Sequence, residues 1–208
     1  MTVNEAPPGR RSRKRRSTRT ALATAALDLF EEQGFVATTI EDITERADVA
    51  RRTFFRHFPS KEAALLPDTE EYEQRVTAAL DHQELPLTMS GIVDAFAQAI
   101  DAMQGDEALQ RRRAAVIADN RLHVGNSAWE SFVATRDSLV GHLAARTGRP
   151  TDDQRIHLAV SLALFALSVS YTRWTESTDG AGPREGFTGT IEVLRGLLDG
   201  EITLGDAD

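Results

Sequence analysis

The first regular pattern of apolar positions begins just after Ser17. Apolar side chains recur there three and four positions apart, a spacing typical of the buried face of an amphipathic helix. These positions are Leu22, Ala25, Ala26, Leu29 and Phe30, and Gly34 ends the pattern. Residues 1–16 contain almost no apolar side chains, so we expect them to form a disordered basic arm rather than a packed element.

Two short helices are expected to follow this first helix. Thr38 or Thr39 can cap the first of them, because an acidic residue three positions later, Glu41 or Asp42, can close a capping box. The second covers residues 50–58 and leaves room for only a short connection. Two short helices joined by a turn of about three to four residues are typical of a helix-turn-helix. Residues 17–66 are therefore expected to form a three-helix DNA-binding domain.

The second short helix carries the residue types that read DNA. In a helix-turn-helix, the N-terminal residues of the second helix meet base edges in the major groove, where an arginine fork can bond O6 and N7 of one guanine. Phe54 and Phe58 are four positions apart, so we expect both to pack inward. The expected DNA contacts are Arg13, Arg15, Arg16, Thr38, Thr39, Ala50, Arg51, Arg52, Thr53, Phe55, Arg56, His57 and Lys61.

The charge distribution adds to this interpretation. The chain has a net charge of -8, yet residues 1–66 hold 12 Lys and Arg against 9 Asp and Glu, while the remainder holds 12 against 23. A basic head on an acidic body fits a module that binds a polyanion such as DNA. A simply solvated tail is the alternative explanation for the basic run at residues 10–16, where six of seven residues are basic.

Composition also restricts the compartment. The chain has no cysteine, which excludes disulfides and thiolate metal sites and fits a reducing compartment, so we expect a cytoplasmic protein. The longest apolar run, residues 158–169, is shorter than the roughly 18 residues that a membrane span needs. We therefore expect a soluble protein with no membrane partner.

Residues 19–66, with the segment ARRTFFRHFPSKE, resemble the DNA-binding domain of the TetR family of bacterial regulators. The family's usual pattern has Gly where this chain has Asp48, Ser where it has Ala50 and Tyr where it has Phe55. Asp48 still tolerates a left-handed turn, whereas the other two changes remove hydroxyls that could bond phosphates. The resemblance implies an all-α, dimeric, ligand-responsive repressor that leaves a palindromic DNA operator when its ligand binds.

Residues 67–208 contain only helical patterns. Gly125 is expected to separate two of these helices, and Thr151 with Gln154 to form a capping box for the longest one. The expected helices cover residues 68–83, 90–104, 106–120, 127–147, 151–176 and 184–199. The longest is apolar nearly all round and must be covered, so we expect a homodimer built from residues 151–176 and 184–198.

Three downstream segments, EALQRRRAAVIADN, AWESF and YTRWTE, resemble a TetR branch whose C-terminal domain binds acyl-CoA-like ligands, the mycofactocin-type regulators among them. This resemblance implies a small-molecule site in the second domain. Core packing is the simpler explanation for most of its aromatic residues, and ion pairing for the arginines at 111–113. The expected ligand contacts are Phe96, Arg113, Trp129, Phe132, Phe165 and Trp174.

Catalytic and metal-binding patterns are missing from the sequence. The five histidines are scattered, and there is no phosphate-binding glycine loop or nucleophile elbow, so we expect no metal, no cofactor and no enzyme activity. Two alternatives stay open at this point: an acyl-ligand carrier or enzyme whose basic head is incidental, and a nonspecific nucleic-acid binder that relies on the basic arm.

Overall fold

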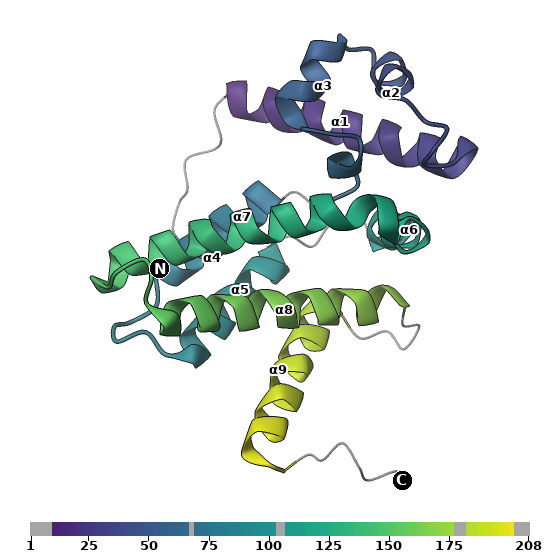
Figure 1. Ribbon diagram of the computed structural model, residues 1–208. Coiled ribbons are helices and arrows are strands. Elements are labelled where there is room, and N and C mark those ends of the chain that lie inside the picture. Colours follow the sequence, from purple (N-terminus) through teal and green to yellow (C-terminus); the bar gives the residue numbers. More distant parts are fainter. Residues whose placement is uncertain (1–9, 67–68, 103–106, 177–181, 202–208) are drawn as a thin grey trace, which may run out of the picture. The chain divides into compact units, whose positions relative to one another are not determined.

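The computed structural model describes residues 10–66, 69–102, 107–176 and 182–201, and every regular element within these ranges is helical (Figure 1). The all-α prediction is confirmed. The elements are α1 (Arg10–Gln33), α2 (Ile40–Arg46), α3 (Arg51–His57), a 3-10 turn η1 (Glu62–Ala64), α4 (Thr69–Asp81), α5 (Met89–Ala102), α6 (Glu107–Asp119), α7 (Arg121–Thr147), α8 (Gln154–Glu176) and α9 (Pro183–Asp199).

The chain divides into two compact units. Unit 1 comprises Met1–Pro67 and Ala115–Ala128, and unit 2 comprises Asp68–Ala114 and Trp129–Asp208. The expected boundary after residue 66 lies beside the first division, but residues 115–128, expected in the second domain, belong to unit 1. As a result, α6 and α7 each contribute residues to both units.

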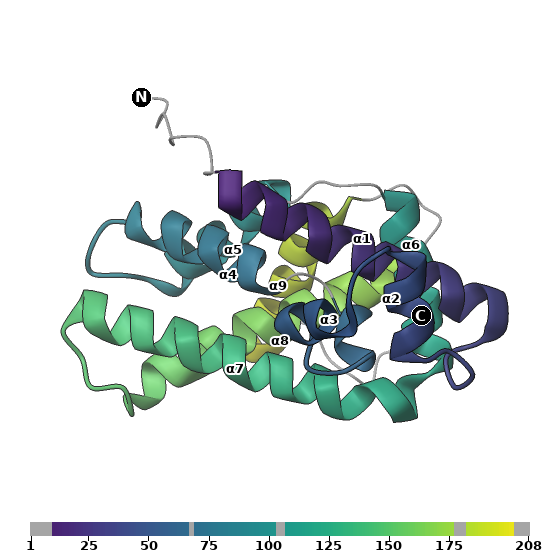
Figure 2. The ribbon, with the colours of Figure 1, turned by 90° about the horizontal axis from the view of Figure 1, so that it is seen from above.

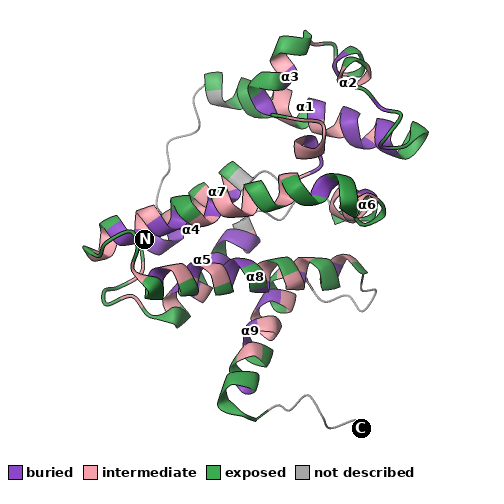
Figure 3. Cartoon of the chain, viewed as in Figure 1, coloured by how far each residue is buried: buried purple, intermediate pink, exposed green. Residues whose placement is uncertain are grey.

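The core of unit 1 forms where α1 packs against α2 and η1. Leu22 and Ala26, which belong to the predicted apolar pattern, are fully buried there together with Ile43 of α2. Figure 3 shows buried positions along α1. α1 begins at Arg10, so the expected arm is helical over residues 10–16 instead of disordered, while residues 1–9 lie outside the described chain. Arginine and lysine are good helix formers, and extending an existing helix costs far less than nucleating one.

The α2–α3 connection follows the expected chemistry. Thr39 caps α2 by accepting a hydrogen bond from the Asp42 amide (3.1 Å), and the Asp42 carboxylate accepts one from the Thr39 amide (2.8 Å). This reciprocal box lowers the pKa of Asp42 through those hydrogen bonds. Asp48 adopts φ 51, the left-handed turn that its residue type tolerates, and it lets α3 start at Arg51.

The left-handed turn at Asp48 gives a stability prediction. Asp48→Ala is expected to lower the free energy of unfolding by about 1 kcal/mol, because a Cβ without a local polar group is unfavourable at positive φ. Asp48→Gly is expected to leave stability equal or higher. Urea unfolding followed by circular dichroism measures both variants, and equal stability of the alanine and glycine variants would contradict the assigned turn.

Unit 2 is built around α5, which packs against α4, α8 and α9. α4 and α5 lie side by side in both views (Figures 1 and 2). The buried core of unit 2 contains residues of α4, α5, α7, α8 and α9. Fully buried members include Val76 of α4, Phe96 of α5 and Phe187 of α9.

Three expected helix boundaries in or near unit 2 were wrong. Gly125 does not separate two helices, because α7 begins at Arg121 and continues through it. Thr151 does not cap α8; instead the carboxylate of Asp153 accepts a hydrogen bond from the Arg155 amide (2.9 Å) at the start of α8. Pro59 followed by Ser60 also predicts a helix start, but residues 62–64 form only the short 3-10 turn η1. A glycine is tolerated inside a helix, and helix ends predicted from local signals commonly differ from the observed ends by one or two residues.

Candidate nucleic-acid interface

The exposed side of α3 is cationic. Arg51, Arg52 and Arg56 are exposed, and the Phe55 ring beside them keeps 47% of its surface accessible. On the opposite side Phe54 is completely buried. The buried phenylalanine anchors the helix to unit 1, so its arginine side is presented outward on a fixed support.

Arg51 is held in place by two neighbours. Its guanidinium forms an ion pair with the Glu41 carboxylate of α2, and its Cζ lies 5.6 Å from the centroid of the Phe55 ring. Both partners are exposed, so the pair adds little stability by itself. The two contacts favour one orientation of the Arg51 side chain beside α2.

Arg19 of α1 fixes the far end of α3, and sequence reasoning missed it. Its Nη1 donates to the His57 carbonyl (2.7 Å), and its Cζ lies 4.3 Å from the centroid of the Phe58 ring. A helix C-terminus leaves carbonyls without intrahelical partners and favours a cation. The signal available in the sequence was the need for such a cation, but its position on α1 required the fold.

Two threonines of the expected interface have structural contacts. Thr38 is 1% exposed and its hydroxyl donates to the Gly34 carbonyl (2.9 Å), so the expectation that it contacts DNA is corrected. Thr39 is exposed, but its hydroxyl serves the capping box of α2. Both side chains shape the chain between α1 and α2.

His57 and Lys61 also differ from expectation. His57 is 9% exposed, and burial, helped by the positive charge of nearby Arg56, lowers its pKa, which disfavours the charged form that would attract a phosphate. Lys61 directs its Nζ to the Phe35 carbonyl (2.7 Å) and the Thr38 carbonyl (2.9 Å), while lying 4.5 Å from the Phe35 ring centroid. Lys61 therefore clamps the turn after α1.

The other expected contacts lie on accessible parts of unit 1. Ala50 is the exposed N-cap residue of α3, and Thr53 is half-buried in its first turn. The basic side chains Arg13, Arg15 and Arg16 are exposed on the first turns of α1.

The clamp by Lys61 can be tested. Lys61→Met is expected to lower the free energy of unfolding by about 1–2 kcal/mol, because it removes charged donors from two carbonyls while keeping much of the apolar stem. The salt dependence of DNA binding should stay unchanged. The slope of the logarithm of the DNA-binding constant against the logarithm of salt concentration gives a second test: if its magnitude falls by about 1 and stability is unchanged, Lys61 contacts phosphate.

The expected ligand contacts do not converge. Phe96 is buried in the core, with Tyr72 and Phe187 at 6.1 and 6.3 Å between ring centroids. Trp174 lies near the C-terminal end of α8. Arg111 donates a hydrogen bond to its carbonyl (2.8 Å), and the Arg111 Cζ lies 4.8 Å from the centroid of its ring. Arg111 thus satisfies the C-terminal end of α8.

The remaining ligand candidates lie elsewhere. Trp129 and Phe132 stack on each other at 5.7 Å along α7, and Arg113 is half-buried on α6. Phe165 is 64% exposed on α8, so the structure does not place its ring in the core of unit 2. An aromatic residue at helical spacing can face a core or a second molecule, and the spacing alone does not distinguish these.

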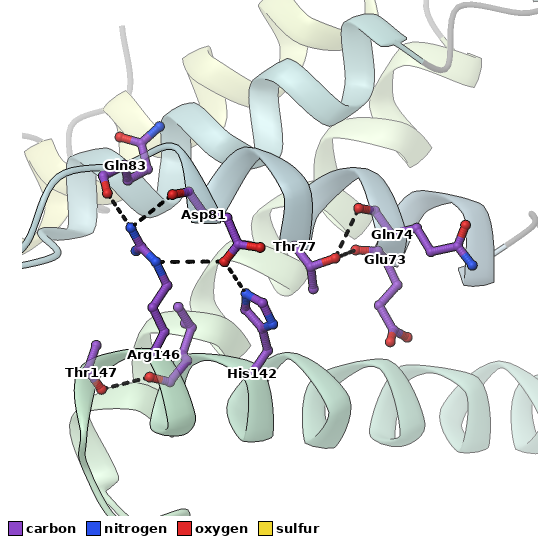
Figure 4. A network of polar contacts seen from close by, with 9 residues as sticks. Glu73, Gln74, Thr77, Asp81, Gln83, His142, Arg146 and Thr147 are labelled. Atoms are coloured by element: carbon purple, nitrogen blue, oxygen red, sulfur yellow. Dashed lines mark hydrogen bonds and ion pairs between the residues drawn. The ribbon is translucent and has the colours of Figure 1, made fainter. Parts of the chain in front are cut away.

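A polar network joins α4 to α7 (Figure 4). The Asp81 carboxylate lies 2.8 Å from His142 Nε2 and 3.7 Å from Arg146 Nε, and Arg146 also donates to the carbonyls of Asp81 (3.3 Å) and Gln83. Because these bonds close the end of α4, we interpret the network as structural. Within the described ranges, no cluster of three His, Asp or Glu side chains could hold a metal ion.

Family models match both parts of the chain. Residues 22–66 match the family model "Bacterial regulatory proteins, tetR family", and residues 87–198 match that of the "MftR C-terminal domain". The chain belongs to the TetR family. The predicted resemblance to both the family and its mycofactocin-regulator-like branch is confirmed. The TetR family consists of transcriptional regulators, so the alternative of an enzyme is excluded.

The relatives match in two ways. The regulator TcmR of Streptomyces glaucescens is 47% identical over 74 residues, which cover 36% of this chain and 33% of TcmR. The putative mycofactocin biosynthesis regulator MftR of Mycobacterium tuberculosis is 22% identical over 187 residues, or 90% of this chain and 94% of MftR. The chain thus matches one third of TcmR and nearly all of MftR.

A solved structure shares the fold. The TetR-family repressor FadR of Thermus thermophilus, solved with lauroyl-CoA, aligns with a TM-score of 0.52 and 22% identity. The alignment covers 91% of this chain and 98% of FadR. Both chains therefore share an all-helical fold with an N-terminal helix-turn-helix and a C-terminal helical domain.

Proposed function

We propose that this TetR-family chain is a cytoplasmic, homodimeric repressor that leaves a palindromic operator when a small apolar or acyl-CoA-like ligand binds unit 2. The observation that carries the DNA-binding part is the cationic side of α3. Arg51 and Arg52 stand exposed at the N-terminal end of α3, above a completely buried Phe54. In a helix-turn-helix this end meets base edges.

The dimer rests on an apolar surface of α8 and α9. Leu158, Leu162 and Phe165 are exposed at helical spacing on α8, and Val193 and Leu197 are exposed on α9. Exposed apolar stripes of this kind favour association, and a second copy would bury them in an isologous interface. α8 is the single helix in the described ranges whose length and composition would suit a membrane. The other side of α8 packs against α5 and α9 of the same chain. We therefore interpret its exposed apolar side as a dimer surface and not as a membrane contact.

The ligand class rests on similarity. The match to the MftR C-terminal domain covers most of unit 2, and FadR, which shares the fold, was solved with lauroyl-CoA. An aromatic core contributed by α4, α5 and α9 offers an apolar environment for an acyl chain. These observations support an acyl-CoA-like ligand for this chain as well.

The route from ligand to DNA runs through α7. Its residues 121–128 belong to unit 1, where the His123 ring stacks on Phe35 at 5.6 Å, and the rest of this helix belongs to unit 2. Phe35 is the residue whose carbonyl accepts a hydrogen bond from Lys61. A ligand that prefers a shifted α7 would therefore move the turn that supports α2 and α3. A ligand with equal affinity for both arrangements would release nothing.

The proposal is tested by selecting duplexes from a random library and measuring affinity with fluorescence anisotropy. We expect the selected duplex to bind roughly 10³-fold or more tightly than random DNA, and lauroyl-CoA to release it. Equal affinity for selected and random duplexes would show a nonspecific binder and contradict the proposal. Specific binding that lauroyl-CoA leaves unchanged would contradict the ligand class alone.

A further inference from the structure

Tyr72 carries an unexplained polar group in the core of unit 2. It lies on α4 with 9% of its surface exposed, and its hydroxyl is buried without a hydrogen-bond partner. A buried polar group without a partner costs free energy, and each such group in a folded protein calls for an explanation. Phenylalanine would fill the same volume without this cost.

Tyr72 differs from the other buried groups of this kind in unit 2. There the unpartnered nitrogens of the described residues belong to Arg75 and Arg146, and both guanidinium groups bond elsewhere, to Glu71 (2.8 Å) and to the Gln83 carbonyl. Tyr171, by contrast, donates to the Gln110 side-chain oxygen (2.9 Å). Within the described part of unit 2, Tyr72 is thus the buried side chain whose one polar group has no hydrogen-bond partner.

The surroundings of Tyr72 are aromatic. Its ring contacts Phe96 edge to face at 6.1 Å, and Phe96 stacks on Phe187 at 6.3 Å, so α4, α5 and α9 each contribute one ring. Phe96 is also the expected ligand contact that lies in this core. A hydroxyl at one end of a set of apolar rings is how a site orients an apolar ligand with a single polar atom.

The charge around Tyr72 restricts that polar atom. Burial raises the pKa of the Tyr72 phenol, with no charged group of the described chain contributing. Arg75, one turn along α4, is already paired with Glu71. A carboxylate entering this core would lose its hydration without gaining a cation, whereas a carbonyl oxygen loses much less. The position therefore favours an uncharged acceptor.

We propose that the Tyr72 hydroxyl donates a hydrogen bond to an uncharged carbonyl oxygen of the ligand, within the aromatic core formed with Phe96 and Phe187. This inference rests on the proposed function, because it assumes that unit 2 binds a small apolar ligand. It narrows that ligand to molecules with a neutral carbonyl on an apolar chain, such as a thioester, and disfavours free carboxylates at this point.

The chain offers a matched control, because Tyr72 and Tyr171 are its two tyrosines. The probes are lauroyl-CoA and S-dodecyl-CoA, a thioether that lacks the carbonyl, titrated calorimetrically into the full-length protein. The parent and Tyr171→Phe are expected to prefer lauroyl-CoA by about tenfold, the worth of one well-made hydrogen bond. Tyr72→Phe should bind lauroyl-CoA about tenfold more weakly and should no longer distinguish the two probes.

Thermal unfolding without ligand gives a second readout. Tyr72→Phe is expected to keep or raise the unfolding midpoint, since the lost hydroxyl had no partner, whereas Tyr171→Phe should lower it by breaking the bond to Gln110. A lowered midpoint for Tyr72→Phe would overturn the inference, because the hydroxyl would then be satisfied in the ligand-free protein, for instance by a buried water.

The outcomes separate this inference from the proposed function. If Tyr72→Phe binds lauroyl-CoA as tightly as the parent does, the inference fails while the ligand class stands. Tighter binding of laurate than of lauroyl-CoA by the parent would also overturn it. If the parent binds none of these probes, the ligand class fails and the inference fails with it, although DNA binding would be unaffected.

Discussion

Replacing Arg52 with alanine is expected to weaken binding of the selected duplex by roughly 5- to 150-fold for each half-site, the range for losing one bidentate contact to guanine. Arg52 is exposed at the N-terminal end of α3, and its removal leaves the buried support of that helix intact. Binding to random duplexes should fall far less, because that binding depends on total charge. Fluorescence anisotropy on selected and shuffled duplexes measures both effects.

Arg46 provides the matched control. It is an exposed arginine of the same unit, placed in the last turn of α2 and paired with the Glu32 carboxylate through two hydrogen bonds of 3.0 and 2.6 Å. Arg46→Ala removes the same charge without touching α3. If it reduces specific binding as much as Arg52→Ala does, the loss reflects bulk charge, and the assignment of α3 as the reading helix is wrong.

The second large effect is expected at the α8–α9 surface. Phe165→Asp is expected to weaken dimerisation by at least about 100-fold, because the symmetric interface would bury two charges where two aromatic rings had packed. The folded protomer should keep its helix content, since Phe165 is exposed within one chain. Sedimentation velocity at micromolar concentration measures the association, and operator affinity should fall with it.

Leu122→Asp is the control for this prediction. Leu122 is an exposed leucine near the start of α7, outside α8 and α9. The variant introduces the same charge and should stay dimeric. A dimeric Phe165→Asp protein would refute the proposed interface. A monomeric Leu122→Asp protein would show that the interface includes the start of α7.

Much of unit 1 could be predicted from its sequence, because local signals there agree with one another. The apolar spacing of α1, the capping box at Thr39 and the inward Phe54 all appear as expected. What the sequence could not show is which polar side chains bind the protein's own backbone. Lys61 and Thr38 were predicted to contact DNA, yet both satisfy carbonyls of the turn after α1. Those carbonyls become neighbours only after folding.

Unit 2 was less predictable for a related reason. Helical periodicity identifies the apolar face of a helix. It does not distinguish a face that packs in the core from a surface that another molecule covers. Phe96 and Phe165 were both predicted ligand contacts, and the structure buries the first and exposes the second. Tyr72 was missed, although a tyrosine on the same helical face as the buried Val76 and Leu80 is a readable signal.

Two copies of the chain are expected to bind one operator, each through one α3 helix. Sedimentation equilibrium of the protein with the selected duplex tests it most directly. We expect two protomers per duplex, with half-site centres about 34–36 Å apart or a multiple of that spacing. A saturated complex of one protomer per duplex, or one in which the double variant Arg51→Ala/Arg52→Ala assembles as tightly as the parent, would contradict the account.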